Sequence, residues 1–250
     1  YAHLHLSNLN ADVSSINIDS TAYRADFNNI SVTESCGLSV KEFSAGAEFS
    51  DKHIELKNLS LLTSASKITG NTRLAYSSFN GFLNDLWNTE TLLKIDNSSI
   101  NINEIFLFVP FLASDPYLSK FKNSDILLSA QSDGKINDLN IENLEISALA
   151  KTFLKSECRL TGLPDMNALR FDATIDRFSS SITDIQQFVD PELFAGLNLP
   201  PYFELKGNAK GKLNSLNGNI ELTSSFGNIA ADGFYQDNGK SRLDTFNIDF

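Results

Sequence analysis

The sequence has few of the residues on which catalytic and metal sites usually depend. It contains two cysteines and three histidines in 250 residues. Cys36 and Cys158 stand far apart and outside metal-ligand spacing, so we read them as two thiols, with one long-range disulfide as the alternative in an oxidising compartment. No motif of a zinc protease, a serine hydrolase, a phosphate-binding loop or a dithiol oxidoreductase occurs. We therefore expect neither an enzyme nor a cofactor.

Long hydrophobic runs and positive charge are scarce as well. The most apolar stretch, at 105–112, is shorter than the roughly 18 residues of a membrane-spanning helix, and it contains Pro110. The 31 acidic and 20 basic residues give a net charge of −11. This balance disfavours nucleic acid as a partner, and it disfavours docking of the outer surface on anionic lipid head groups. Because neither an initiator methionine nor a leader opens the sequence, we expect a segment of a longer protein.

Two patterns that superficially resemble sites are better explained by structure. His3 and His5 alternate with leucines, which places both imidazoles on the polar face of a strand without an evident third metal ligand. The glycine-rich GNAKG at 207–211 runs into an alternating strand rather than a helix, so we expect strand there and no phosphate loop. The sequence predicts no metal site.

What the sequence does contain is a recurring interruption of a strand pattern. Apolar residues alternate, then step by three across an asparagine, then alternate again. This h-x-h-x-N-h-x-h pattern, with alanine counted as apolar, occurs at 4–11, 25–32, 54–61 and 139–146, with the asparagines Asn8, Asn29, Asn58 and Asn143. An extra residue inserted as a β-bulge restores the facing of the apolar side chains, and asparagine tolerates the left-handed or bridge-like backbone that such a kink needs. The pattern predicts bent strands with one apolar face.

A longer repeat lies over the first. GKINDLN at 134–140 matches GKLNSLN at 211–217, and INEIFLFV at 102–109 matches ITDIQQFV at 182–189. The second pair predicts short helices with Asn103 or Thr183 as the N-cap and an acidic residue in the first turn. We therefore expect one continuous repeat-built β segment with approximate units 1–98, 99–178 and 179–250.

Short alternating stretches fill most of the remaining chain, separated by glycine, asparagine, aspartate and serine. They lie at 66–78, 155–163, 169–178, 202–213 and 227–236. The predicted fold is mostly β: an elongated, curled, taco-like antiparallel-rich sheet with a hydrophobic groove and a few short helical segments. A second sheet, the curled sheet itself or a ligand with long apolar tails would cover the apolar face. The unfinished, repeating pattern favours the open sheet over a sandwich.

Several stretches together resemble the TamB/AsmA-like family of Gram-negative bacteria, most of all its long TamB relatives. They are IELKNLSLLTSASKITGNTRLAYSS at 54–78, INEIFLFVPFL at 102–112, GKINDLNIENLEIS at 134–147 and CRLTGLPD at 158–165. The resemblance implies a periplasmic body anchored in the inner membrane by an N-terminal helix and reaching the outer membrane. It also implies a hydrophobic-lined groove, linked both to phospholipid transport between the membranes and to outer-membrane protein assembly with BamA-family barrels. It implies no catalytic residue.

Our leading hypothesis is a cofactor-free groove segment that conducts phospholipids between the two membranes, with acyl chains as the partner. The candidate lipid-binding residues are Ile54, Leu56, Leu59, Leu61, Leu139, Ile141, Leu144 and Ile146. The alternative is an outer-membrane protein assembly factor that pairs its sheet edges with nascent strands. A further alternative is a structural β-repeat protein, whose motif leucines would be packed against a second sheet.

Overall fold

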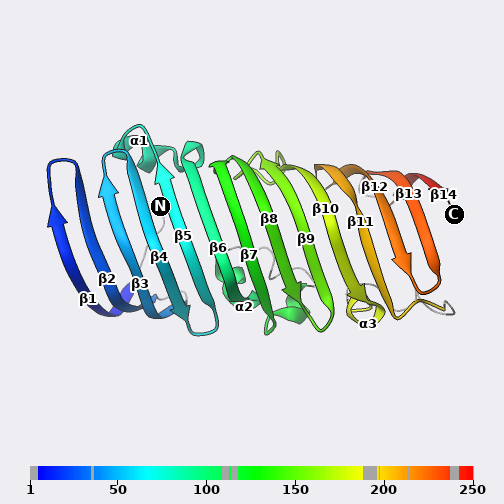
Figure 1. The fold of residues 1–250 in the computed structure, drawn as a ribbon, viewed down its shortest axis with the longest axis horizontal. Coiled ribbons are helices and arrows are strands. Elements are labelled where there is room, and N and C mark those ends of the chain that lie inside the picture. The colour runs from blue at the N-terminus through cyan, green and yellow to red at the C-terminus, as the bar shows by residue number, and fades with distance from the viewer. Residues whose placement is uncertain are drawn as a thin grey trace. The chain divides into compact units, whose positions relative to one another are not determined.

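The computed structural model describes residues 5–34, 37–108, 113, 118–187, 196, 198–212, 214–236 and 242–249 (Figure 1). The chain divides into two compact units, Tyr1–Ile136 and Asn137–Phe250. Each unit is mostly β, with strands that are visibly curved (Figure 1).

In the first unit every strand pairs antiparallel with the next along the chain. Its strands are β1 (Leu6–Ile18), β2 (Ala22–Glu34), β3 (Ser39–Ser50), β4 (His53–Thr63), β5 (Lys67–Ala75), β6 (Glu90–Asn101) and β7 (Asp125–Lys135). Two short helical segments, α1 (Phe79–Asn84) and η1 (Leu86–Asn88), connect β5 to β6. Two others, α2 (Ile102–Phe108) and η3 (Leu118–Phe121), lie between β6 and β7. Figure 1 places α1 and α2 at opposite ends of the strands.

The second unit repeats the same plan. Consecutive strands again pair antiparallel. They are β8 (Asp138–Ala148), β9 (Thr152–Thr161), β10 (Arg170–Ser181), β11 (Tyr202–Lys212), β12 (Ser215–Ser224), β13 (Gly227–Gln236) and β14 (Arg242–Asp249). A single helical turn, α3 (Ile182–Ile185), follows β10. The predicted antiparallel, mostly β fold with few short helices is confirmed, and GNAKG lies in strand β11 as expected.

The described strands leave little apolar surface fully enclosed. Five apolar residues of the described chain are buried, and three of them are alanine or leucine on or beside strands. The other two, Phe106 of α2 and Phe121 of η3, lie in the helical segments after β6. Within each unit the described strands belong to the chain-ordered pairings above, so none of them forms a second layer over the sheet of its own unit. The apolar side chains of the strands are therefore mostly half-buried.

Glycine allows neighbouring strands to approach closely at one point of the apolar face. Gly70 of β5 lies opposite Leu59 of β4 and Ile95 of β6. A Cβ atom on Gly70 would lie 1.9 Å from the carbonyl oxygen of Lys94. Any side chain at this position would force the β5 and β6 backbones apart.

Candidate functional site: one apolar face of the sheet

The bulge in β4 keeps its apolar residues on one side. Ile54 and Leu56 pair with Leu74 and Thr72 of β5, whereas Leu59 and Leu61 pair with Gly70 and Ile68. These four β5 residues are two apart without interruption, so they share one face, and directly paired residues of antiparallel strands point to the same side. All four candidate residues of β4 therefore lie on one face, and each is half-buried.

The same geometry recurs in β8 of the second unit. Leu139 and Ile141 pair with Leu160 and Cys158 of β9, and Leu144 and Ile146 pair with Ser156 and Leu154. These β9 partners again alternate without a break. The structure thus brings the four candidate residues of β8 together on one half-buried face, as it does those of β4.

The asparagines of the bulges have the left-handed backbone, one of the two predicted forms, at three of the four positions. Asn8, Asn58 and Asn143 have φ of 55°, 53° and 50°. The amide of Asn58, which the bulge removes from the ladder, donates to the side-chain oxygen of Asn71 across the strand at 2.9 Å. The bulge therefore leaves no unpaired amide there.

At Asn29 the kink does not take the left-handed form, one of the two backbone forms predicted for it. Phe27 pairs with Ala45 and Ile30 with Phe43, so Asn28 and Asn29 together face one residue of β3. Neither of the two has a positive φ. A β-bulge needs no left-handed residue when its first residue lies near the right-handed helical region.

A further bulge at a left-handed asparagine lies in β6, where the sequence motif is degenerate. Asn97 has a φ of 41°, and its amide donates to the hydroxyl of Ser129 at 3.0 Å. Ile95 pairs with Ala130 and Ser98 with Leu128, the same two-against-one register. The motif missed it because Ser98 occupies the position that is apolar in the other copies. The step from Ile95 to Ile100 across an asparagine is the signal that remains in the sequence.

Aromatic side chains close one end of the apolar face in the first unit. The rings of Phe49 and Phe79 are 5.6 Å apart in an edge-to-face arrangement, and those of Tyr76 and Phe82 are stacked at 5.0 Å. Phe49 pairs with Ile54 and so lies on the apolar face. Helix α1 therefore packs its phenylalanines on the end of the face that contains the β4 candidates.

Helices α2 and α3, which follow strands β6 and β10, are each connected to a hairpin by a buried carboxylate. Glu104 of α2 accepts a hydrogen bond from the Thr63 hydroxyl at 2.6 Å and from the Ala65 amide at 3.2 Å, both at the β4–β5 turn. Asp184 of α3 accepts from the Lys151 amide at 2.8 Å and the Thr152 hydroxyl at 2.9 Å, both at the β8–β9 turn. The two matching sequence segments thus make the same tertiary contact.

The predicted N-caps of these helices are wrong by two residues. α2 begins at Ile102 and α3 at Ile182. The residue before α3, Ser181, accepts a hydrogen bond from the Asp184 amide and is the cap. The strand runs directly into each helix, so the residue that ends the strand serves as the cap and Asn103 or Thr183 is already helical. Pro110 and Pro191, the prolines that follow the two matching segments in the sequence, lie outside the described residues, as do Phe111 and Leu112.

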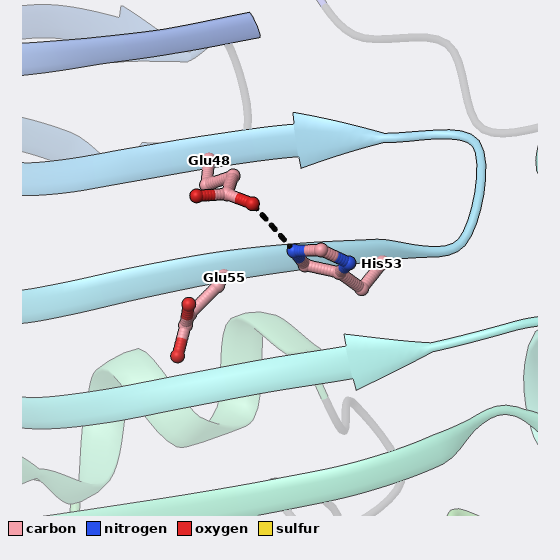
Figure 2. Close-up of side chains that lie close together, drawn as sticks. All are labelled: Glu48, His53 and Glu55. Atoms are coloured by element: carbon pink, nitrogen blue, oxygen red, sulfur yellow. Dashed lines mark hydrogen bonds and ion pairs between the residues drawn. The ribbon is translucent and has the colours of Figure 1, made fainter. Parts of the chain in front are cut away.

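The opposite face of the sheet is charged. Cross-strand ion pairs join Arg159 to Asp138 at 2.7 Å and Lys155 to Glu145 at 2.9 Å. In the first unit, Glu48 accepts from the Arg24 guanidinium at 2.8 Å and from the His53 imidazole at 3.0 Å (Figure 2). The Arg24 guanidinium holds the pKa of the Glu48 carboxyl below its usual value. The sheet therefore separates an apolar face from a hydrated, charged one.

No family model, curated protein or solved structure matches the chain. None of the described helices is long and apolar enough to cross a membrane.

The remaining candidates of the sequence have structural explanations where they are described. His5 is exposed, and His3 lies outside the described residues. Cys158 is a free thiol on the apolar face, and its partial burial raises its pKa. Cys36 lies outside the described residues. The sequence reasoning missed the grouping of Glu48, His53 and Glu55, for which the only signal was a histidine and two acids beside a tight turn.

Proposed function

We propose that the apolar face binds the acyl chains of phospholipids, and that the chain is a segment of a TamB/AsmA-like lipid conduit. The observation that carries the proposal is the uncovered apolar face of the described strands. Bulges keep this face continuous along β4 in the first unit and along β8 in the second, and no described strand of the same unit forms a layer over it. Monomeric proteins rarely expose a contiguous apolar patch larger than a few hundred Å² unless it binds something.

The energetics favour a ligand with long apolar tails. Fully burying one large aliphatic side chain stabilises by about 1.5–3 kcal/mol, and the eight candidate residues are only half-buried. Acyl chains would bury these side chains without forming hydrogen bonds, so the chains are not held at any fixed position on the face. The charged opposite face stays in water. Conduction in this proposal is passive movement along the face, with no cofactor.

The cellular setting follows from the family resemblance. A conduit of this kind lies in the periplasm, and the full-length protein is anchored in the inner membrane and reaches the outer membrane. Phospholipids that move between these membranes are the proposed substrate. The proposal rests on the same stretches, above all 54–78 and 134–147, that carry both the resemblance and the apolar face.

Lipid analysis of the purified protein tests the proposal directly. We expect native mass spectrometry to detect co-purifying phospholipid, and we expect the double variant Leu59→Arg/Leu61→Arg to lose it. The matched control is Leu62→Arg/Leu127→Arg, which places the same charges at exposed leucines on the opposite face. Both variants should keep their strand content by circular dichroism.

Two results would count against the conduit. Equal lipid content in the two double variants would mean that the apolar face does not bind the lipid. Photo-crosslinks from position 59 that capture outer-membrane protein strands and no lipid would instead support the assembly factor.

A further inference from the structure

Three metal-ligating side chains meet on the charged face at the β3–β4 hairpin. Glu48 lies two residues before the end of β3, His53 begins β4, and Glu55 follows it two residues later (Figure 2). One potential ligand atom from each lies within 4.8 Å of the other two. Glu48 and Glu55 are directly paired in the register of the two strands. A tight hairpin therefore fixes all three groups, without a contribution from a mobile loop.

The imidazole is held by a second contact of its own. The Ser50 hydroxyl lies 2.9 Å from His53 Nδ1, and Nε2 points to the Glu48 carboxylate at 3.0 Å (Figure 2). Ser50 also accepts from the His53 amide at 3.0 Å, so the serine is fixed by the turn itself. A hydrogen bond to the distal nitrogen is how proteins orient a histidine ligand.

A basic side chain beside the cluster contacts one oxygen of each carboxylate. Arg24 contacts Oε2 of Glu48 at 2.8 Å, and Lys57 contacts Oε2 of Glu55 at 3.2 Å. Two carboxylates directly opposite each other in a sheet repel, so a cation between their other oxygens is stabilising. Arg24 and Lys57 offset part of that charge, and we expect an affinity in the micromolar rather than the nanomolar range.

We propose that Glu48, His53 and Glu55 bind a divalent transition metal, with Zn²⁺ as the ion that best fits one imidazole and two carboxylates. These are ligand types that zinc takes in proteins, and water can complete the coordination. Calcium and magnesium are poor fits because they prefer an all-oxygen ligand set.

The position of the site gives it a structural consequence. The Tyr76 hydroxyl donates to the Ser50 carbonyl at 2.8 Å, and Tyr76 stacks on Phe82 of α1. The metal therefore fixes the turn to which the aromatic cluster at the end of the apolar face is attached. A ligand that binds only the folded state stabilises it, so zinc raises the melting temperature of the protein.

The experiment is a titration with Co²⁺, whose visible absorption reports coordination, followed by competition with Zn²⁺. It uses the full 250-residue chain with His3→Ala and His5→Ala, which leaves His53 as its one histidine. We expect one Co²⁺ per chain. His53→Ala should lower the affinity by at least about tenfold, and Ser50→Ala, which removes the orienting hydroxyl, by about tenfold.

The control is Glu145→Gln, a carboxylate that is paired with a lysine on the same face of another strand. Its affinity for Co²⁺ should equal that of the parent, and Zn²⁺ should raise the melting temperature of both. The proposal is overturned by an absence of saturable Co²⁺ binding. It is equally overturned by unchanged affinity in the His53→Ala variant or by equal losses in His53→Ala and Glu145→Gln. None of these three outcomes bears on lipid binding at the opposite face.

Discussion

Asn58 illustrates how one residue type decides the facing of a whole strand. A left-handed backbone costs an ordinary L-residue about 1–2 kcal/mol, and asparagine adopts it more readily than most. With a φ of 53°, Asn58 absorbs the extra residue that returns Leu59 and Leu61 to the face of Ile54 and Leu56. The asparagine is therefore selected for its backbone, since its own side chain is exposed.

We predict that Asn58→Ala lowers the free energy of unfolding by about 1 kcal/mol because alanine is strained at positive φ. Asn58→Gly should be close to neutral. Asn29→Ala is the matched comparison, since Asn29 holds the same motif position with a negative φ. This substitution should lower the free energy of unfolding by less than Asn58→Ala does. Urea denaturation followed by circular dichroism measures all three. Equal effects of the two alanine variants would contradict the argument from φ.

At the scale of elements, the repeat is defined by a contact as well as by a sequence. The first amide of α2, that of Ile102, donates to the Ser124 carbonyl just before β7, and that of Ile182 donates to the Pro201 carbonyl just before β11. The buried carboxylates of Glu104 and Asp184 then reach back to the preceding hairpins. Each helix therefore joins the end of one hairpin to the start of the next strand.

Replacing the Glu104 carboxylate by an amide should weaken the contact between α2 and the β4–β5 turn. In Glu104→Gln the amide cannot accept two hydrogen bonds as well as a carboxylate does. We expect a loss of about 1–3 kcal/mol, the usual effect of disrupting a buried charged hydrogen bond. Hydrogen exchange should accelerate at the amides of Ala65 and Ser66. Glu42→Gln, at an exposed acid of β3, serves as the control and should leave both quantities unchanged.

The second unit offers an independent version of the same test. Asp184→Asn should accelerate hydrogen exchange at the amides of Lys151 and Thr152, because the carboxylate accepts hydrogen bonds from the Lys151 amide and the Thr152 hydroxyl. The hydrogen-exchange rates of the β4–β5 turn should equal those of the parent protein. Faster exchange at both turns would show that each carboxylate contact does not stabilise its own hairpin alone.

For the molecule as a whole, the sequence was informative wherever structure follows from local periodicity. Alternation predicted the strands, and the step across Asn58 or Asn143 predicted the bulges that keep one face apolar. The pattern failed at Ser98, where a buried serine replaces an aliphatic residue, because periodicity depends on hydrophobicity alone.

Contacts between distant residues were beyond this kind of reasoning. Glu104 and Thr63 are 41 residues apart, and nothing in either local sequence pairs them. The grouping of Glu48 with Glu55 likewise depends on the register of the β3–β4 hairpin. A one-residue change of register would place the two acids on opposite faces.

Cys158 provides a reporter for the proposed role of the apolar face. Its thiol lies on that face, paired with Ile141 and Ala173, and desolvation raises its pKa. Only the thiolate reacts. Alkylation of Cys158 should therefore be slower at neutral pH than alkylation of a solvent-exposed cysteine, and its rate should rise at a higher pH.

Acyl chains on the face would cover the same thiol. In a Cys36→Ser background, we expect iodoacetamide to label lipid-loaded protein more slowly than delipidated protein at every pH, with the pH profile displaced further upward. Returning phospholipid to the delipidated protein should restore the slow rate. Identical rates with and without lipid would mean that acyl chains do not reach the face at β9.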